Sequence, residues 1–140
     1  MSIWPVLDDA ALPERSAAVI ADIKATRNTD FINNFWRVLA NDPALLERTW
    51  GSLKEVMGPG EIDPLTKEML YVAVSIVNGC EYCIRSHTAA ARAKGMSEAQ
   101  LGELLAIVGM ASETNRLATG LQVPVDTAFM PASSEDDGRA

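Results

Sequence analysis

The sequence predicts an all-α protein of about six helices that pack as antiparallel hairpins. Apolar residues recur at helical spacing in almost every segment, and no segment shows the alternation of a half-buried strand. Two Asp-Pro pairs, Asp42-Pro43 and Asp63-Pro64, each offer a capping side chain followed by a proline at the first helical position. Glycines follow the helical segments where the chain has to turn.

The first half of the chain holds three predicted helices. The first spans residues 13–27, where isoleucine and alanine recur at helical spacing, and the second spans residues 31–40. The third begins after Asp42 and spans residues 43–57. It ends at Gly58-Pro59-Gly60, because glycine and proline both interrupt helices.

The second half holds three more predicted helices. One spans residues 64–77, and Asn78-Gly79 breaks it. The next spans residues 80–94 and stops at Gly95, where a left-handed cap is expected. Ser97-Glu98-Ala99-Gln100 has the pattern of a capping box and begins a last helix that extends to about residue 118.

Length and composition indicate one globular domain. The chain has 140 residues, of which 48% are hydrophobic and 22% charged. We expect a single domain over residues 1–130 and a disordered polar tail over residues 131–140. The net charge of −7 excludes a general nucleic-acid binder, since no basic stripe is available to neutralise phosphates.

The sequence indicates a cytoplasmic protein. Its first residues carry neither the basic region nor the long apolar run of a signal peptide. The longest mainly apolar run, residues 69–77, is too short to span a bilayer, so no membrane association is expected. In a reducing cytoplasm a cysteine pair is more often catalytic or metal-binding than a permanent structural disulfide.

Both cysteines and the only histidine of the chain lie close together, as Cys80, Cys83 and His87. In a helix, positions i, i+3 and i+7 share one face, so two thiols and an imidazole would lie together. Cys80 follows the break at Gly79, and the exposed N–H groups of a helix amino end favour a thiolate. Cys83 lies one turn before His87, which can exchange a proton with it. Each cysteine therefore has its own route to activation, and the order of attack stays open.

Glu68 is a candidate third member of the site. It lies twelve residues before Cys80, within the predicted helix over residues 64–77, in a segment that is otherwise strongly apolar. The turn at Gly79 would fold that helix back along the next one and bring the carboxylate towards the thiols and His87. A buried carboxylate beside His87 could orient the ring and hold or pass a proton.

Glu68 followed by Cys80-x-x-Cys83-x-x-x-His87 resembles the active-site pattern of the alkylhydroperoxidase D-like proteins, within the carboxymuconolactone decarboxylase superfamily. The resemblance covers roughly residues 43–117. It implies an all-α alkylhydroperoxidase D-like fold assembled as a homo-oligomer, such as a trimer or hexamer. It also implies thiol-dependent reduction of hydroperoxides, with no cofactor or metal and with a dithiol or disulfide reductant protein as partner.

The resemblance also implies roles for these residues. Cys83 would attack the peroxide and become a sulfenic acid, and Cys80 would condense with it to a disulfide. Glu68 and His87 would form the proton relay. Tyr82 departs from the best-studied peroxidase branch, which has a histidine there, so that branch's full relay does not transfer. The decarboxylase branch does not use this cysteine pair, which argues against lactone decarboxylation.

Other interpretations fit the same residues. The protein could be a thiol-disulfide reductase or a redox sensor with little peroxide turnover. It could instead be a non-enzymatic oligomer in which Cys80, Cys83, His87 and Glu68 bind zinc, although thiolates one helical turn apart suit a closed tetrahedral site poorly. The cysteines could also be small packed side chains, Glu68 a solvated helix residue and His87 a neutral packed one.

Overall fold

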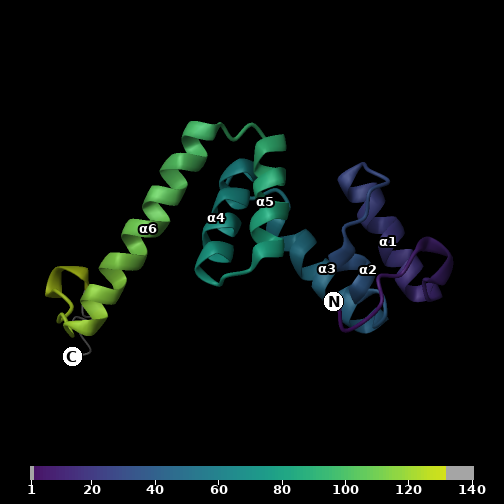
Figure 1. Ribbon diagram of the computed structural model, residues 1–140, viewed down its shortest axis with the longest axis horizontal. Coiled ribbons are helices and arrows are strands. Elements are labelled where there is room, and N and C mark those ends of the chain that lie inside the picture. The colour runs from purple at the N-terminus through teal and green to yellow at the C-terminus, as the bar shows by residue number, and fades with distance from the viewer. Residues whose placement is uncertain (1, 132–140) are drawn as a thin grey trace, which may run out of the picture. The chain divides into compact units, whose positions relative to one another are not determined.

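The computed structural model describes residues 2–131, which form an all-α fold without a β-strand (Figure 1). This confirms the predicted fold class. The α-helices are α1 (Glu14–Arg27), α2 (Asn34–Leu39), α3 (Pro43–Met57), α4 (Pro64–Val77), α5 (Glu81–Ala93) and α6 (Glu98–Gly120). Two short 3-10 helices, η1 (Asp9–Ala11) and η2 (Thr127–Phe129), flank them in the sequence.

The capping residues read from the sequence begin two of the helices as predicted. The Asp42 side chain accepts hydrogen bonds from the N–H groups of Ala44 and Leu45 at the start of α3. Ser97 accepts from the N–H of Gln100, whose side chain in turn accepts from the N–H of Ser97, which completes the capping box of α6.

The chain divides into two compact units, Met1–Pro64 and Leu65–Ala140. The single domain expected over residues 1–130 stays a prediction. The expected tail, residues 131–140, lies outside the described residues apart from Pro131. Among the described residues, no helix has the length and apolar character needed to cross a membrane.

The first unit has a continuous apolar core built by α1, α2 and α3. The rings of Trp36 and Trp50 meet edge to face at its centre, with centroids 5.5 Å apart. The core also contains the buried side chains of Ile20, Ile23, Ile32, Ala40 and Leu46. Trp50 donates its indole N–H to Asp22, 2.6 Å away, so its polar edge is satisfied.

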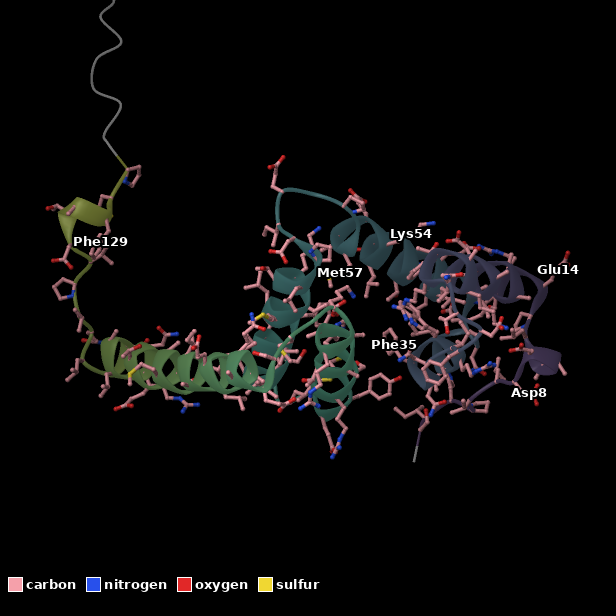
Figure 2. The ribbon with its side chains drawn as sticks, turned by 90° about the horizontal axis from the view of Figure 1, so that it is seen from above. Asp8, Glu14, Phe35, Lys54, Met57 and Phe129 are labelled. Atoms are coloured by element: carbon pink, nitrogen blue, oxygen red, sulfur yellow. The ribbon has the colours of Figure 1, made fainter. Side chains whose placement is uncertain are left out.

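Among the described residues, the second unit buries four apolar side chains, against seven in the first unit. Its helices α4 and α5 form a hairpin, visible side by side in Figure 1. Of the 23 residues in α6 only Leu104 is buried, and side chains project from all around this helix in Figure 2. A unit with so few buried apolar residues has little hydrophobic stabilisation of its own.

Candidate active site

The hairpin of α4 and α5 owes its tight turn to Gly79. Gly79 adopts a φ of +66°, a conformation that glycine accepts without steric cost. The N–H of Cys80 then donates to the carbonyl of Ser75 at 3.0 Å and closes the end of α4. The carbonyl of Cys80 accepts from the N–H of Ile84 at 2.9 Å and opens α5. Hydrogen bonds from two helix ends therefore hold the backbone of Cys80.

Cys80 is the N-cap of α5 and not its first helical residue. Its φ of −87° and ψ of 90° are extended, and α5 begins at Glu81. The predicted helix start at about Cys80 is therefore one residue early, and a shared face for Cys80, Cys83 and His87 stays a prediction. The prediction that Cys80 lies at the helix amino end is confirmed, and that position is the one that favours a thiolate.

Glu68 is a buried carboxylate with a partner on each oxygen. Its side chain is only 8% exposed, although it lies in the first turns of α4. Oε2 lies 2.7 Å from Nδ1 of His87, and Oε1 accepts a hydrogen bond from Nζ of Lys94 at 2.8 Å. Burial raises the pKa of Glu68, but the hydrogen bonds from His87 and Lys94 outweigh burial, and the net shift of the pKa is downward. The site is built to hold Glu68 as an anion.

His87 is held in one orientation by two neighbours from α4. Its ring stacks on Tyr71 with centroids 3.6 Å apart and an angle of 18° between the ring planes. Because an ionised carboxylate only accepts hydrogen bonds, Nδ1 of His87 carries the proton that it shares with Glu68. This leaves Nε2 as the nitrogen that can take up a proton in the neutral ring.

The two thiols are free and half-buried, and they contact each other. The Cys83 side chain donates towards Cys80, and that contact, with the backbone N–H groups of Cys83 and Tyr82, lowers the pKa of Cys80. Burial, together with the neighbouring Cys80, raises the pKa of Cys83 to about 11. The pair therefore holds one proton on Cys83 and favours the thiolate on Cys80.

The structure brings together most of the site that the sequence predicts. It places Glu68 against His87, and it places the two cysteines against each other. It does not join His87 to Cys83: within the described part of the chain, no direct hydrogen bond links the imidazole to either thiol.

Sequence reasoning missed two members of the site, Tyr71 and Lys94. Both follow a recognised site residue at a spacing that repeats a helix face. Tyr71 lies three positions after Glu68, and Lys94 lies seven positions after His87. The pattern was therefore present, but neither residue type is distinctive enough to be selected by its spacing alone.

The zinc interpretation finds no support in the geometry. Among residues 2–131, no group of three or more His, Cys, Asp and Glu side chains is arranged to hold a metal ion. The nitrogen of His87 that faces Glu68 is already occupied by a hydrogen bond to it.

Comparison with known proteins assigns the chain to a family. The model of the carboxymuconolactone decarboxylase family matches residues 43–126, which include the whole candidate site. The protein belongs to this family. Within it, the chain is similar to a crystal structure of the alkylhydroperoxidase AhpD core from Rhodospirillum rubrum. The two are 59% identical with a TM-score of 0.88, over 92% of this chain and 97% of the other.

Two further proteins similar to this chain carry the name alkyl hydroperoxide reductase AhpD. The protein from Solibacter usitatus is 32% identical over 124 residues, which are 86% of this chain and 68% of the relative. The protein from Azorhizobium caulinodans is 32% identical over 103 residues, which are 71% of this chain and 57% of the relative. The chain is thus AhpD-like and shorter than these two relatives.

Proposed function

We propose that the protein is a thiol-dependent peroxidase that reduces hydroperoxides through Cys80 and Cys83. One observation carries this proposal: two free thiols contact each other on the hairpin that also holds a buried Glu68–His87 pair. Thiols in this arrangement can be oxidised and can exchange protons during the reaction. The names of the relatives support the same chemistry.

The reaction is a two-electron oxidation of the thiol pair. The thiolate of Cys83 attacks the distal peroxide oxygen, the O–O bond breaks, and Cys83 becomes a sulfenic acid while an alcohol leaves. Cys80 then attacks the sulfur of that sulfenic acid, and a disulfide and water form. Two thiols and one hydroperoxide give one disulfide, one alcohol and one water. A dithiol donor returns the disulfide to two thiols by exchange.

The electrostatics of the thiol pair explain why a relay is needed. The raised pKa of Cys83 means that this thiol keeps its proton at neutral pH unless a base takes it. The Cys80 thiolate is the nearest base, because Cys83 already donates towards it. Nε2 of His87, oriented through Nδ1 by Glu68, then takes this proton from Cys80 and passes it to the leaving alkoxide, which leaves Cys80 as the thiolate for the second step. A water between His87 and the thiols would complete this path.

A second candidate function is thiol-disulfide exchange with little peroxide turnover. The lowered pKa of Cys80 favours thiol-disulfide exchange, since a thiolate at a helix amino end is suited to attack a disulfide. The partner would be a disulfide or dithiol protein in the reducing cytoplasm that the sequence predicts. Turnover with a hydroperoxide, compared with turnover on a small disulfide, separates the two functions.

The proposal predicts an intramolecular disulfide. One equivalent of a hydroperoxide added to reduced protein should remove both free thiols, because the chain has two cysteines and they contact each other. Intact-mass spectrometry should show the loss of two hydrogens within one chain, and dithiothreitol should restore them. Oxidation that yields only disulfide-linked dimers, or a stable sulfonic acid, would contradict it.

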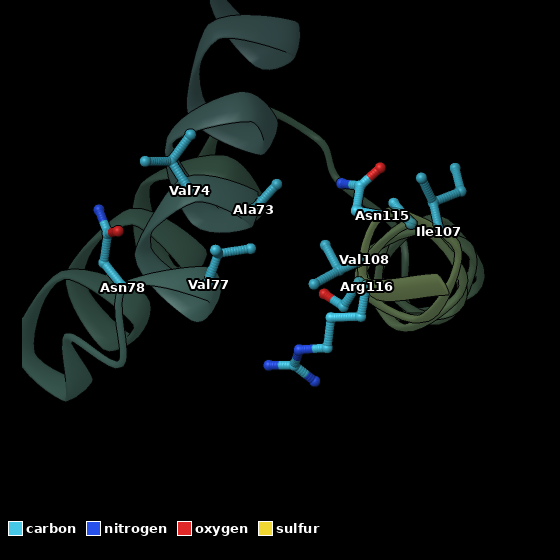
Figure 3. A pocket seen from close by; sticks show the side chains of 10 residues that line it. Ala73, Val74, Val77, Asn78, Ile107, Val108, Asn115 and Arg116 are labelled. Carbon is cyan, nitrogen blue, oxygen red and sulfur yellow. The ribbon is translucent and has the colours of Figure 1, made fainter. Parts of the chain in front are cut away.

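We also propose that the protein works as a homo-oligomer, such as the trimer or hexamer that the resemblance implies. An apolar groove of about 440 Å³ lies between α4 and α6, lined on one side by Val74 and Val77 and on the other by Ile107 and Val108 (Figure 3). Val74, Val77 and Ile107 are all more than half exposed in the single chain. An apolar surface of this kind is typical of an interface between subunits.

The oligomer proposal predicts that a charge in the groove separates the subunits. Ile107→Glu should lower the mass measured by light scattering towards the chain mass of 15.1 kDa, because an unpaired carboxylate cannot be buried cheaply. Ile3→Glu is the matched control, since Ile3 is fully exposed and lies in the other unit. Native protein at the mass of a single chain at micromolar concentration would contradict the proposal.

A further inference from the structure

Lys94 contacts the candidate site but has no role in the reaction proposed above. It follows the last residue of α5, and its backbone N–H closes that helix by donating to Ala90 and Ala91. Gly95, with a φ of +99°, then turns the chain away. The side chain of Lys94 runs back to Glu68, 2.8 Å from Oε1, and remains 40% exposed. Its ammonium is thus partly hydrated at one end of a buried hydrogen-bond chain.

The hydrogen-bond chain runs from Lys94 through Glu68 to His87. Lys94 holds Oε1 of the carboxylate, and His87 holds Oε2. An isolated buried carboxylate is costly and tends to gain a proton or a cationic partner. With Lys94 present, the negative charge is already balanced, and His87 is not required to be the cation.

We propose that Lys94 is a positioning residue, whose ammonium balances the buried charge of Glu68 so that His87 remains neutral with Nε2 ready to take a proton. This inference rests on the proposed function for its consequence in catalysis. Its electrostatic part concerns only Glu68, His87 and Lys94, and can be tested without a peroxide.

The other titratable groups around the cluster do not replace Lys94. Tyr71 on α4 stacks on the ring of His87, and the thiols of Cys80 and Cys83 lie near Tyr71. These groups are neutral or negative, so none of them can balance Glu68. Without Lys94, the Glu68–His87 pair carries one uncompensated negative charge and should bind a proton at higher pH than in the native protein. That proton occupies the base that the relay needs.

The experiment measures the protonation of His87 directly. Because it is the only histidine of the chain, ¹⁵N-histidine labelling gives one pair of ring nitrogen signals to follow against pH in reduced protein. We expect the native protein to show a neutral ring with the proton on Nδ1. In Lys94→Met the midpoint of proton uptake should rise by about 1 pH unit or more. Lys94→Arg should restore the native midpoint, since it restores the charge.

A general effect of a cation at the end of α5 is tested by a matched control. Arg92 lies in the last turn of the same helix and pairs with Glu98, not with Glu68. Arg92→Met removes a cation from the same helix end and should leave the His87 midpoint unchanged. An equal shift in Arg92→Met and Lys94→Met would overturn the inference, and so would an unchanged midpoint in Lys94→Met.

A second readout links the cluster to the thiols. The rate of thiol alkylation by iodoacetamide should reach half its plateau at higher pH in Lys94→Met than in native protein, and Lys94→Gln should behave alike. If Lys94→Met folds poorly, Lys94→Gln and Lys94→Arg repeat the comparison with polar side chains. A protein without peroxide turnover but with the expected His87 shifts would contradict the proposed function alone. Normal turnover with no His87 shift in Lys94→Met would contradict only the role of Lys94.

Discussion

Replacing Cys83 by serine should abolish peroxide turnover, because a serine hydroxyl cannot accept the oxygen that a thiolate takes from a peroxide. The loss should be complete within detection, since Cys80 alone has no second thiol in the chain with which to form a disulfide. Steady-state hydroperoxide consumption with dithiothreitol as donor is the measurement. The Cys83→Ser variant should keep native helix content, because Cys83 is only half-buried.

Cys80→Ser is the comparison that assigns the two roles. If Cys83 attacks first, this variant should react once with peroxide and stop at a sulfenic acid on Cys83, which dimedone traps as a stable adduct. Cys83→Ser should give no such adduct at a comparable rate. The opposite pattern, with a fast adduct on Cys80 in Cys83→Ser, would mean that the lowered pKa of Cys80 decides the order of attack.

Removing either member of the buried Glu68–His87 pair should slow the peroxide reaction by about 10²–10⁴-fold. Glu68→Gln removes the anion that holds His87 through Nδ1, and His87→Ala removes the ring itself. If the two groups act as one relay, the double variant should be scarcely slower than either single variant, since groups that act as a unit are not additive. Rapid mixing with a single equivalent of peroxide isolates this step from recycling.

Glu98→Gln is the matched control for the carboxylate. Glu98 is well exposed and pairs with Arg92, so its amide variant should react at the native rate. Native rates in both Glu68→Gln and His87→Ala between pH 6 and 8 would contradict the relay and leave the helix amino end as the activator. Losses that multiply in the double variant would instead indicate two separate roles, with Glu68 supporting the fold.

The local signals in the sequence predicted the helices well because helix ends are set by adjacent residues. Asp42-Pro43, Gly79, Gly95 and the Ser97 capping box each act within a turn of their own position, and the structure shows them acting there. The Glu68–His87 contact was also predictable, because a tight turn at Gly79 makes the two adjacent helices pack antiparallel.

Contacts that depend on side-chain reach across that hairpin could not be predicted in the same way. Lys94 has a long flexible chain that could equally have extended into solvent, so its hydrogen bond to Glu68 depends on where α5 ends relative to α4. The sequence predicts Cys80 as the first residue of a helix, whereas its backbone makes hydrogen bonds to the end of α4 and to the start of α5. The exposure of α6 was not predictable either. Apolar periodicity indicates that one face of a helix tends to be buried, but it does not indicate whether the same chain or another one covers that face.

The candidate site is a continuous stretch of one hairpin, from Glu68 to Lys94, and shares no residue with the tryptophan core around Trp36 and Trp50. We therefore expect substitutions in the tryptophan core and substitutions in the candidate site to affect different properties of the protein. Substitutions in the tryptophan core can shift the melting temperature while the thiols react as before. Conversely, substitutions around His87 and the two thiols fall within one short segment of the chain, outside the tryptophan core.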